Sequence, residues 1–251
     1  MKKFFQMTTI VIAAILISIS VSFAMSAEDL TYYTENYPPY NYEKNGQLTG
    51  ISVDTLKLVW EEMGVTPQKI EVVPWARGYN KLQKKSGTCL FATSRTPQRE
   101  ALFKWACPLA EGTRYVLIAK KDRDFSIDSV EDANQFKVGA IRDDVAEQLF
   151  LSQGGDSSSL ESVANMTTNL KKLEKGRIDL IAYGEGSTRK FLEDNGYDVN
   201  DYETVLLLKE TPLCLAFHKS TPEDLVGKFR EALGKVVESE EYQKILDKHT
   251  Q

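Results

Sequence analysis

Hydrophobic residues follow two alternating patterns along most of the chain, one typical of helices and one typical of strands. The segment GISVDTLKLVWEEMG (50–64) has apolar residues near helical spacing and ends at a glycine. Short apolar runs such as KIEVVPW (69–75) and TCLFATS (88–94) are typical of strands. Similar segments alternate up to two closing helices within 221–249. This alternation predicts an α/β fold with mainly parallel sheets flanked by helices.

Two long apolar strands divide the chain into two predicted lobes. They lie near 114–121 and 204–219 and bracket a block with its own strand and helix segments. The last helices must return to the first lobe, so these strands are expected to form a pair of crossovers. We therefore expect lobe 1 at 28–116 and 209–251, and lobe 2 at 117–208. Paired crossovers make a hinge, and a hinge creates a cleft.

The N-terminus has the layout of a secretory signal peptide. Lys2 and Lys3 precede an apolar run over 4–23, and small residues follow. The run is also long enough for an uncleaved membrane anchor. The small residues at its end and the charged residues after them favour cleavage after Ala24. Residues 1–24 are thus predicted to be removed, and the mature chain is expected in the periplasm.

Composition excludes several classes of function. The chain has 31 basic and 36 acidic residues, a net charge of −5, which argues against a nucleic-acid surface. Both histidines, His218 and His249, lie near the C-terminus, and no Cys/His spacing matches a metal site. We expect no metal, no cofactor and no histidine-based catalysis.

Three cysteines, Cys89, Cys107 and Cys214, allow one disulfide in an oxidising compartment. Cys89 and Cys107 are the preferred pair because they flank one short segment, although geometry decides such pairings. The alternative is three buried thiols that serve as small apolar residues.

Four segments in order resemble a known family. They are the YYTENYPPYNYEKNG region from residue 32, TSRTPQRE with FKW at 93–105, KGRIDLIAYGE at 175–185 and ESEEYQKILDKH at 238–249. Together they resemble the bacterial extracellular solute-binding proteins of the polar amino-acid receptor type. The resemblance implies a two-lobed periplasmic-binding-protein fold of type II. It also implies a monomer that closes on a small solute and presents it to an ABC importer.

The resemblance also assigns the first candidate binding residues. In the family's amino-acid receptors, an arginine that ends an S/T-x-T-x-x-R pattern clamps the solute carboxylate, and Arg99 holds that position here. Ser94 and Thr96 fall on the hydroxyl positions, and Arg95 is an additional cation. The planar fork of arginine suits a carboxylate because it donates two parallel hydrogen bonds. The alternative is a pair of solvated arginines on the first turn of a helix.

Further candidates in the predicted first lobe are cationic and aromatic. Arg77 and Trp75 lie at the start of a predicted helix, where Trp75 could equally belong to the core. Tyr37 and Tyr40, at a Pro-Pro turn, correspond to the family's ligand-stacking edge, and rigid rings give contact area at little entropic cost. The alternative for both is surface packing around the turn. Glu35 is a candidate to bind a basic group on the solute, with an exposed side chain as the favoured alternative.

The predicted second lobe departs from the family pattern. Amino-acid receptors place an aspartate after the strand that follows G-x-x-D, but that position is Gly184 here. Glu185 is the nearest substitute, beside Tyr183, although its side chain would leave the backbone in another direction. Arg142 precedes two aspartates, one of which is expected to cap a helix. If Arg142 faces the cleft, cations dominate the site.

These residues suggest a carboxylate-bearing solute, anionic or zwitterionic, that is richer in negative charge than a neutral amino acid. An acidic or modified amino acid remains an alternative. Two other functions stay open. An exported enzyme of the same fold, acting like a dehydratase, would need Glu185 as its general acid. A periplasmic sensor partner would bind a solute without a transporter.

Overall fold

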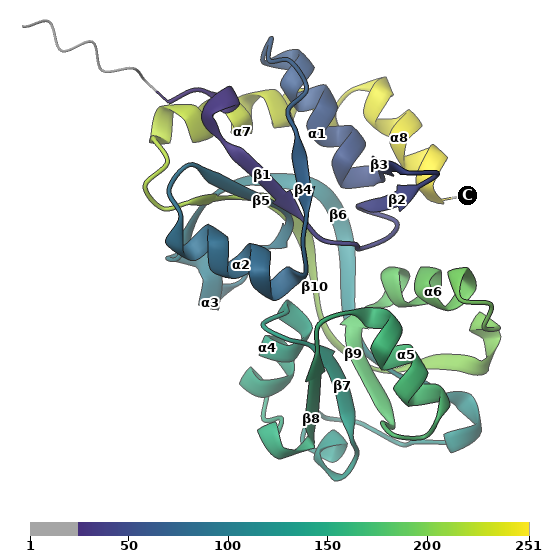
Figure 1. Ribbon diagram of the computed structural model, residues 1–251. Coiled ribbons are helices and arrows are strands. Elements are labelled where there is room, and N and C mark those ends of the chain that lie inside the picture. Colours follow the sequence, from purple (N-terminus) through teal and green to yellow (C-terminus); the bar gives the residue numbers. More distant parts are fainter. Residues whose placement is uncertain (1–24, 251) are drawn as a thin grey trace, which may run out of the picture.

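The computed structural model of the protein describes residues 25–250, so the predicted signal peptide at 1–24 lies outside the described residues. Figure 1 shows two lobes, one above the other, with two long strands running between them. Both lobes combine strands with helices packed on them. The predicted α/β fold with two lobes is confirmed.

Lobe 1 is built from both ends of the described chain. Its central strands are parallel to one another, in the order β4-β1-β5. A small antiparallel hairpin, β2 with β3, lies outside this sheet. The strands and helices of lobe 1 are β1 (Thr31–Thr34), β2 (Tyr42–Lys44), β3 (Gln47–Thr49), α1 (Ile51–Glu62), β4 (Ile70–Val72), α2 (Trp75–Lys84), β5 (Thr88–Ser94), α3 (Pro97–Glu100), α7 (Glu223–Val237) and α8 (Glu240–Thr250).

Lobe 2 is continuous in sequence. Its strands are parallel as well, in the order β9-β7-β8, with a helix after each of them. The elements are β7 (Val138–Ile141), α4 (Val145–Ser152), β8 (Leu160–Val163), α5 (Met166–Glu174), β9 (Leu180–Gly184) and α6 (Glu185–Asp194). The carboxyl ends of parallel strands meet at one edge of a sheet, so the turns after β7, β8 and β9 lie together and face lobe 1 (Figure 1).

Two long strands connect the lobes. β6 (Phe103–Lys120) and β10 (Tyr202–His218) run antiparallel along their whole length. In lobe 1 β10 pairs with β5, and in lobe 2 β6 pairs with β9. All strands except the hairpin therefore form one sheet of eight, β4-β1-β5-β10-β6-β9-β7-β8, that passes through both lobes. The expected lobe boundaries near 116 and 208 fall inside these two strands.

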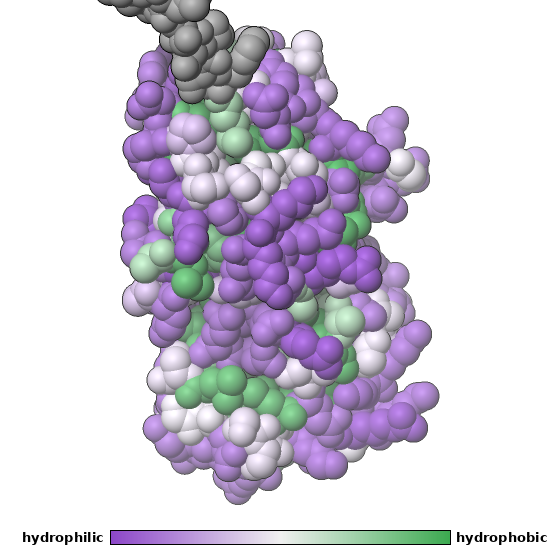
Figure 2. All heavy atoms as spheres, turned by 60° about the vertical axis from the view of Figure 1, so that its left-hand side comes forward, coloured by the Kyte–Doolittle hydropathy of each residue, from purple (hydrophilic) through white to green (hydrophobic). Residues whose placement is uncertain are grey.

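Amphipathic helices cover the sheet as their sequence pattern predicts. In α1 the apolar residues Val53, Leu56, Val59 and Trp60 are buried at helical spacing, while the opposite face is exposed. On the molecular face drawn in Figure 2 most of the surface is hydrophilic and apolar groups form separate areas. No helix within residues 25–250 is long and apolar enough to cross a membrane.

The disulfide pairing preferred from the sequence is wrong. Cys107 and Cys214 are bonded, with 4.6 Å between their Cα atoms, and Cys89 is a buried free thiol. The strand order gives the reason. β10 lies between β5 and β6, so Cys89 on β5 is separated by a whole strand from Cys107 on β6. Cys214 on β10 is adjacent to Cys107, and the bond joins the two connecting strands within lobe 1.

A charged cluster fixes the C-terminal helix to lobe 1. Asp54 of α1 accepts hydrogen bonds from His249 Nε2 at 2.9 Å, Lys248 Nζ at 2.8 Å and Lys57 Nζ at 3.1 Å. Desolvation alone would raise the pKa of Asp54, but these hydrogen bonds outweigh it and hold the pKa below its usual value. The carboxylate form is thus favoured in the folded protein.

Asp54→Asn should lower the free energy of unfolding by about 1–2 kcal/mol at neutral pH, since it removes charged hydrogen bonds. A carboxyl whose pKa is depressed on folding stabilises the protein above its unfolded pKa of about 3.9, and this contribution is lost as the pH falls. Urea unfolding at several pH values should therefore show the wild type and variant converging below about pH 4. The exposed Asp122→Asn serves as the control. Equal stability of D54N and wild type at neutral pH would contradict this account.

Candidate functional site

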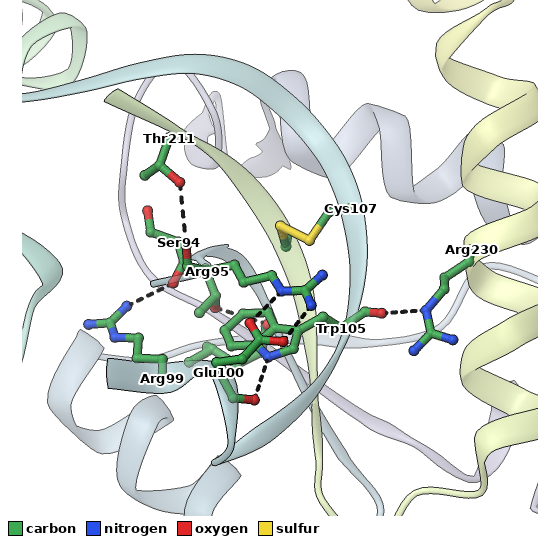
Figure 3. Close-up of a disulfide and its surroundings, with 11 residues drawn as sticks. Ser94, Arg95, Arg99, Glu100, Trp105, Cys107, Thr211 and Arg230 are labelled. Carbon is green, nitrogen blue, oxygen red and sulfur yellow. Dashed lines mark hydrogen bonds and ion pairs between the residues drawn. A yellow bond between two sulfur atoms is a disulfide. The ribbon is translucent and has the colours of Figure 1, made fainter. Parts of the chain in front are cut away.

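Arg99 lies between the two lobes. It follows β5 in the short helix α3, and only 1% of its surface is exposed. Its Nε donates to Gln148 Oε1 at 3.0 Å and its Nη2 donates to the Asp143 carbonyl at 3.2 Å, both on lobe 2. Its Nη1 donates to the Ser94 carbonyl at 3.4 Å within lobe 1 (Figure 3). The guanidinium therefore bridges the lobes.

Aromatic rings of α2 hold the guanidinium from the side of lobe 1. The Arg99 Cζ lies 5.1 Å from the Trp75 ring centre and 4.9 Å from that of Tyr79, and the two rings stack on each other. A cation near an aromatic face is attracted by the ring quadrupole. Trp75 is both buried and part of the interlobe contact, since its Nε1 donates to the Asp143 carbonyl at 2.7 Å.

The turn between β7 and α4 supplies the opposing surface. Asp143 has φ of 60°, an unusual backbone conformation for a residue other than glycine. Its carbonyl oxygen accepts hydrogen bonds from Trp75, Arg99 and also Gln148 Nε2 at 3.1 Å. This turn thus presents one oxygen to several donors at the interface between the lobes.

Arg99 is a buried cation whose hydrogen-bond acceptors are all neutral. They are an amide oxygen and two main-chain carbonyls. Within residues 25–250 no Asp or Glu oxygen lies within ion-pair distance of it. A buried charge is normally paired, because removal from water is costly. A guanidinium has five N–H donors, so Arg99 also retains donors beyond these three bonds.

Tyrosines from both lobes line the same region. The Tyr37 ring stacks on Tyr40 and meets the edge of Tyr183 in lobe 2, with ring centres 5.2 Å apart in each case. Tyr115 Oη and Ser94 Oγ share a hydrogen bond of 2.7 Å. Sequence reasoning did not select Tyr115. Its position where a connecting strand passes between the lobes is the signal that could have identified it.

Gly184 is in direct contact with lobe 1. A Cβ atom at this position would lie 2.0 Å from Tyr37 Oη, so the tyrosine fills the space that a side chain would need. Glu185 does not take over this place. Its carboxylate pairs with Arg114 at 2.9 Å and Arg189 at 3.7 Å and accepts a hydrogen bond from Thr204 Oγ1 at 2.6 Å. The carboxylate is therefore committed to partners on lobe 2 and the connecting strands.

The structure does not gather the other predicted arginines around Arg99. Arg95 pairs with Glu100 through bonds of 2.5 and 2.7 Å, and Figure 3 shows its side chain extending in the opposite direction from that of Arg99. Arg77 is exposed on α2. Arg142 is exposed and donates to the Ser162 carbonyl at 3.4 Å. Of these four arginines Arg99 alone is buried, and Arg142, whose placement in the cleft was the condition for a site dominated by cations, does not line the interlobe cavity.

Two further predicted residues, Thr96 and Tyr40, belong to lobe 1. Thr96 is buried at the start of α3, and its Oγ1 has no hydrogen-bond partner among the described residues. Tyr40 is half-buried and packs on the lobe 1 side of Tyr37.

Two acids lie near Arg99, one on each lobe. Asp144 caps α4, as expected for this turn, and accepts a hydrogen bond from Ala146 N at 2.9 Å. Desolvation raises the pKa of Asp144 to about 6, although the Ala146 bond and the Arg99 charge oppose the rise. Burial likewise raises the pKa of Glu35 well above its usual value, the Asp144 charge adds to the rise, and Arg99 counteracts it. The Glu35 side chain is half-buried, not exposed as favoured from the sequence.

A cavity of about 250 Å³ lies between the lobes beside these groups. Lobe 1 contributes Glu35 and residues 72–74, and lobe 2 contributes residues 164–167, Tyr183 and Phe191. Most of its wall is apolar. The carboxyl ends of β7 and β9 and the turns that follow β1, β4 and β8 meet here, as expected for the carboxyl ends of parallel strands.

The chain is similar to proteins that bind amino acids. A family model for bacterial extracellular solute-binding proteins, family 3, matches residues 30–251. An arginine-binding periplasmic protein of Mannheimia haemolytica is 24% identical over 231 residues, which cover 88% of this chain and 91% of the relative.

Solved structures share the fold. A Streptococcus pneumoniae ABC uptake transporter substrate binding protein with bound histidine superposes with a TM-score of 0.77 at 19% identity, covering 88% of this chain and 92% of that one. A histidine kinase sensor domain with similarity to periplasmic binding proteins also gives a TM-score of 0.77 at 19% identity, covering 88% and 95%. At these identities the likeness concerns the fold.

Gly184→Ala should hinder the approach of the lobes, because its Cβ would meet Tyr37 Oη. The backbone at Gly184, with φ of −67°, tolerates alanine, so the clash is between lobes. We expect solute affinity to fall about tenfold, within the 1–3 kcal/mol scale of overpacking. Titration calorimetry with the solute recovered from native protein, and small-angle scattering at saturation, would measure this.

Gly186→Ala, two residues on, is the matched control because its Cβ would meet nothing within 4 Å. Adding Tyr37→Phe to Gly184→Ala should restore part of the affinity, since the clashing oxygen is removed. Unchanged affinity and unchanged closure in G184A would show that this contact does not limit closure.

Proposed function

Because the chain belongs to family 3 of the bacterial extracellular solute-binding proteins, we propose that it holds its solute by a carboxylate on Arg99 between the lobes. The observation that carries this proposal is the burial of Arg99 among neutral acceptors that bridge both lobes. A carboxylate is a stronger acceptor than an amide or main-chain oxygen for such a donor. It would exchange places with the Gln148 and Asp143 oxygens or use the remaining N–H groups.

Closure follows from contacts made to both lobes at once. A solute shifts the balance between open and closed lobes only by the difference in its affinity for the two states. Arg99, Trp75 and Tyr37 belong to lobe 1, whereas Tyr183 and the Asp143 turn belong to lobe 2. A solute between them gains all these contacts only in the closed state. The amino-acid-binding relatives support an amino acid or a related metabolite as the solute.

The partner we propose is an ABC importer in the membrane, with the mature chain working in the periplasm. The N-terminal sequence, the Cys107–Cys214 disulfide and the similarity to an ABC substrate binding protein support this role. A sensor role is the second candidate, supported by the similarity to a histidine kinase sensor domain. An enzyme of the dehydratase type has weaker support, because Glu185 is ion-paired with two arginines.

Arg99→Ala should weaken solute binding by about 2–4 kcal/mol, the scale for removing one partner of a buried charge pair. Native mass spectrometry of protein purified from its host identifies a retained solute, and titration calorimetry then gives the affinities. Arg95→Ala is the matched control: it removes an arginine from the same segment that is bound to Glu100 and largely exposed. Equal affinities of R99A and wild type would refute the proposed role of Arg99.

A further inference from the structure

We propose that the turn between β7 and α4 forms a latch that closes the lobes with oxygens of the chain itself. The latch consists of the Asp143 carbonyl and the Gln148 side-chain amide, and both accept hydrogen bonds from Arg99. The inference rests on the proposed binding of a solute carboxylate by Arg99, since the carboxylate and the latch then compete for the same donors. A weaker latch should accordingly give tighter solute binding.

The Asp143 carbonyl oxygen joins the two lobes. Within lobe 2 it accepts from Gln148 Nε2 at 3.1 Å, and from lobe 1 it accepts from Trp75 Nε1 at 2.7 Å and Arg99 Nη2 at 3.2 Å. A carbonyl oxygen has two lone pairs, so three donors use its full capacity. Two of the three bonds cross between the lobes, and both would break if the lobes separated. The latch therefore favours the closed arrangement.

The two latch oxygens occupy an edge of the guanidinium on which a carboxylate can bind. Arg99 donates from Nε to Gln148 Oε1 at 3.0 Å and from Nη2 to the Asp143 carbonyl at 3.2 Å. Arg95, in the same segment, donates from the same two nitrogens to the Glu100 carboxylate, at 2.7 Å from Nε and 2.5 Å from Nη2 (Figure 3). Two neutral oxygens thus take the place at Arg99 that one carboxylate takes at Arg95. A solute carboxylate on this edge has to displace both latch oxygens.

The turn is shaped by contacts within lobe 2 that do not involve Arg99. Asp143 has φ of 60°, and its N–H donates to Glu147 Oε2 at 2.6 Å. The Glu147 carboxylate also accepts a hydrogen bond from Ser162 Oγ on β8. These bonds connect the turn, α4 and β8, so lobe 2 alone sets the direction of the Asp143 carbonyl. A preorganised acceptor engages its donors at a lower entropic cost.

Competition decides the sign of the expected effects. The apparent affinity for a solute falls with the fraction of the protein in which its binding groups are available. Neutral oxygens are weaker acceptors than a carboxylate, so a solute is still able to displace them. If the contact between Arg99 and Gln148 instead belonged to the complex with the solute, its loss would weaken binding. The two arrangements therefore predict opposite changes for the same variant.

Substitutions at Gln148 test the latch in both directions. Sodium acetate is the probe, added to mature protein that has been unfolded, dialysed and refolded to remove retained solutes, and followed by NMR of the Trp75 indole N–H. Gln148→Ala removes the oxygen bound to Arg99 Nε and should lower the acetate dissociation constant about fivefold, the scale of one neutral hydrogen bond. Gln148→Glu places a carboxylate beside Arg99 and should raise the constant about tenfold.

Small-angle scattering without added carboxylate measures closure itself. The radius of gyration of Q148A should exceed that of the wild type, whereas Q148E should be as compact as the wild type. Gln243→Ala is the matched control, because this glutamine is exposed on α8, where it donates to Asp247 at 2.9 Å. It should change neither the acetate affinity nor the radius of gyration.

The outcomes separate the latch from the proposed function. Weaker or unchanged acetate binding in Q148A, or a Q148A protein as compact as the wild type, would overturn the latch. Acetate binding that persists unchanged in Arg99→Ala would overturn the proposed function instead. Undetectable acetate binding in both the wild type and Q148A would refute the competition for Arg99. Circular dichroism of each variant establishes that it is folded.

Discussion

The burial of one positive charge between two lobes is the constraint on which this structure depends. Arg99 has left water, yet no described carboxylate pairs with it directly. Its charge is instead stabilised by two aromatic faces, by amide and carbonyl dipoles, and by Coulomb interaction with Glu35 and Asp144, which do not contact it. Oriented dipoles compensate a buried charge less completely than a contacting anion does. The arrangement therefore supports the proposed binding of a solute carboxylate by Arg99.

Keeping the acids out of contact with Arg99 has a functional consequence. A direct ion pair with Glu35 would satisfy both charges and leave little reason for a solute to bind. In the structure Asp144 is held by the end of α4, and Glu35 is held at the end of β1 facing a cavity. Arg99 thus stays buried beside the cavity without an anionic partner, as the proposed binding of a solute carboxylate requires.

Periodicity and motif order were sufficient to predict the fold, because helix and strand patterns report local burial. The alternation of elements and the two long strands indicated the lobes, and the S-R-T-P-Q-R pattern indicated Arg99. Side-chain direction was not predictable in the same way. Arg95 and Arg99 are four residues apart, yet one bonds Glu100 and the other reaches lobe 2. Glu185 and Gly184 are adjacent, but tertiary partners such as Arg114 decide where the carboxylate points. The cysteine pairing failed for the same reason, since it depends on strand order.

The connecting strands are held within each lobe by interactions that do not involve the interlobe contacts. The Cys107–Cys214 bond ties β6 to β10 within lobe 1, where β10 also pairs with β5. In lobe 2 the same strands are held by pairing of β6 with β9, from Tyr115 to Ile118. Between these regions the β6–β10 register is irregular after Thr211, and Gly112 has φ of 70°. Bending at this point would leave both sheets intact, so the proposed closure would change the contacts of Arg99, Trp75 and Tyr37 with lobe 2 while each lobe kept its own core.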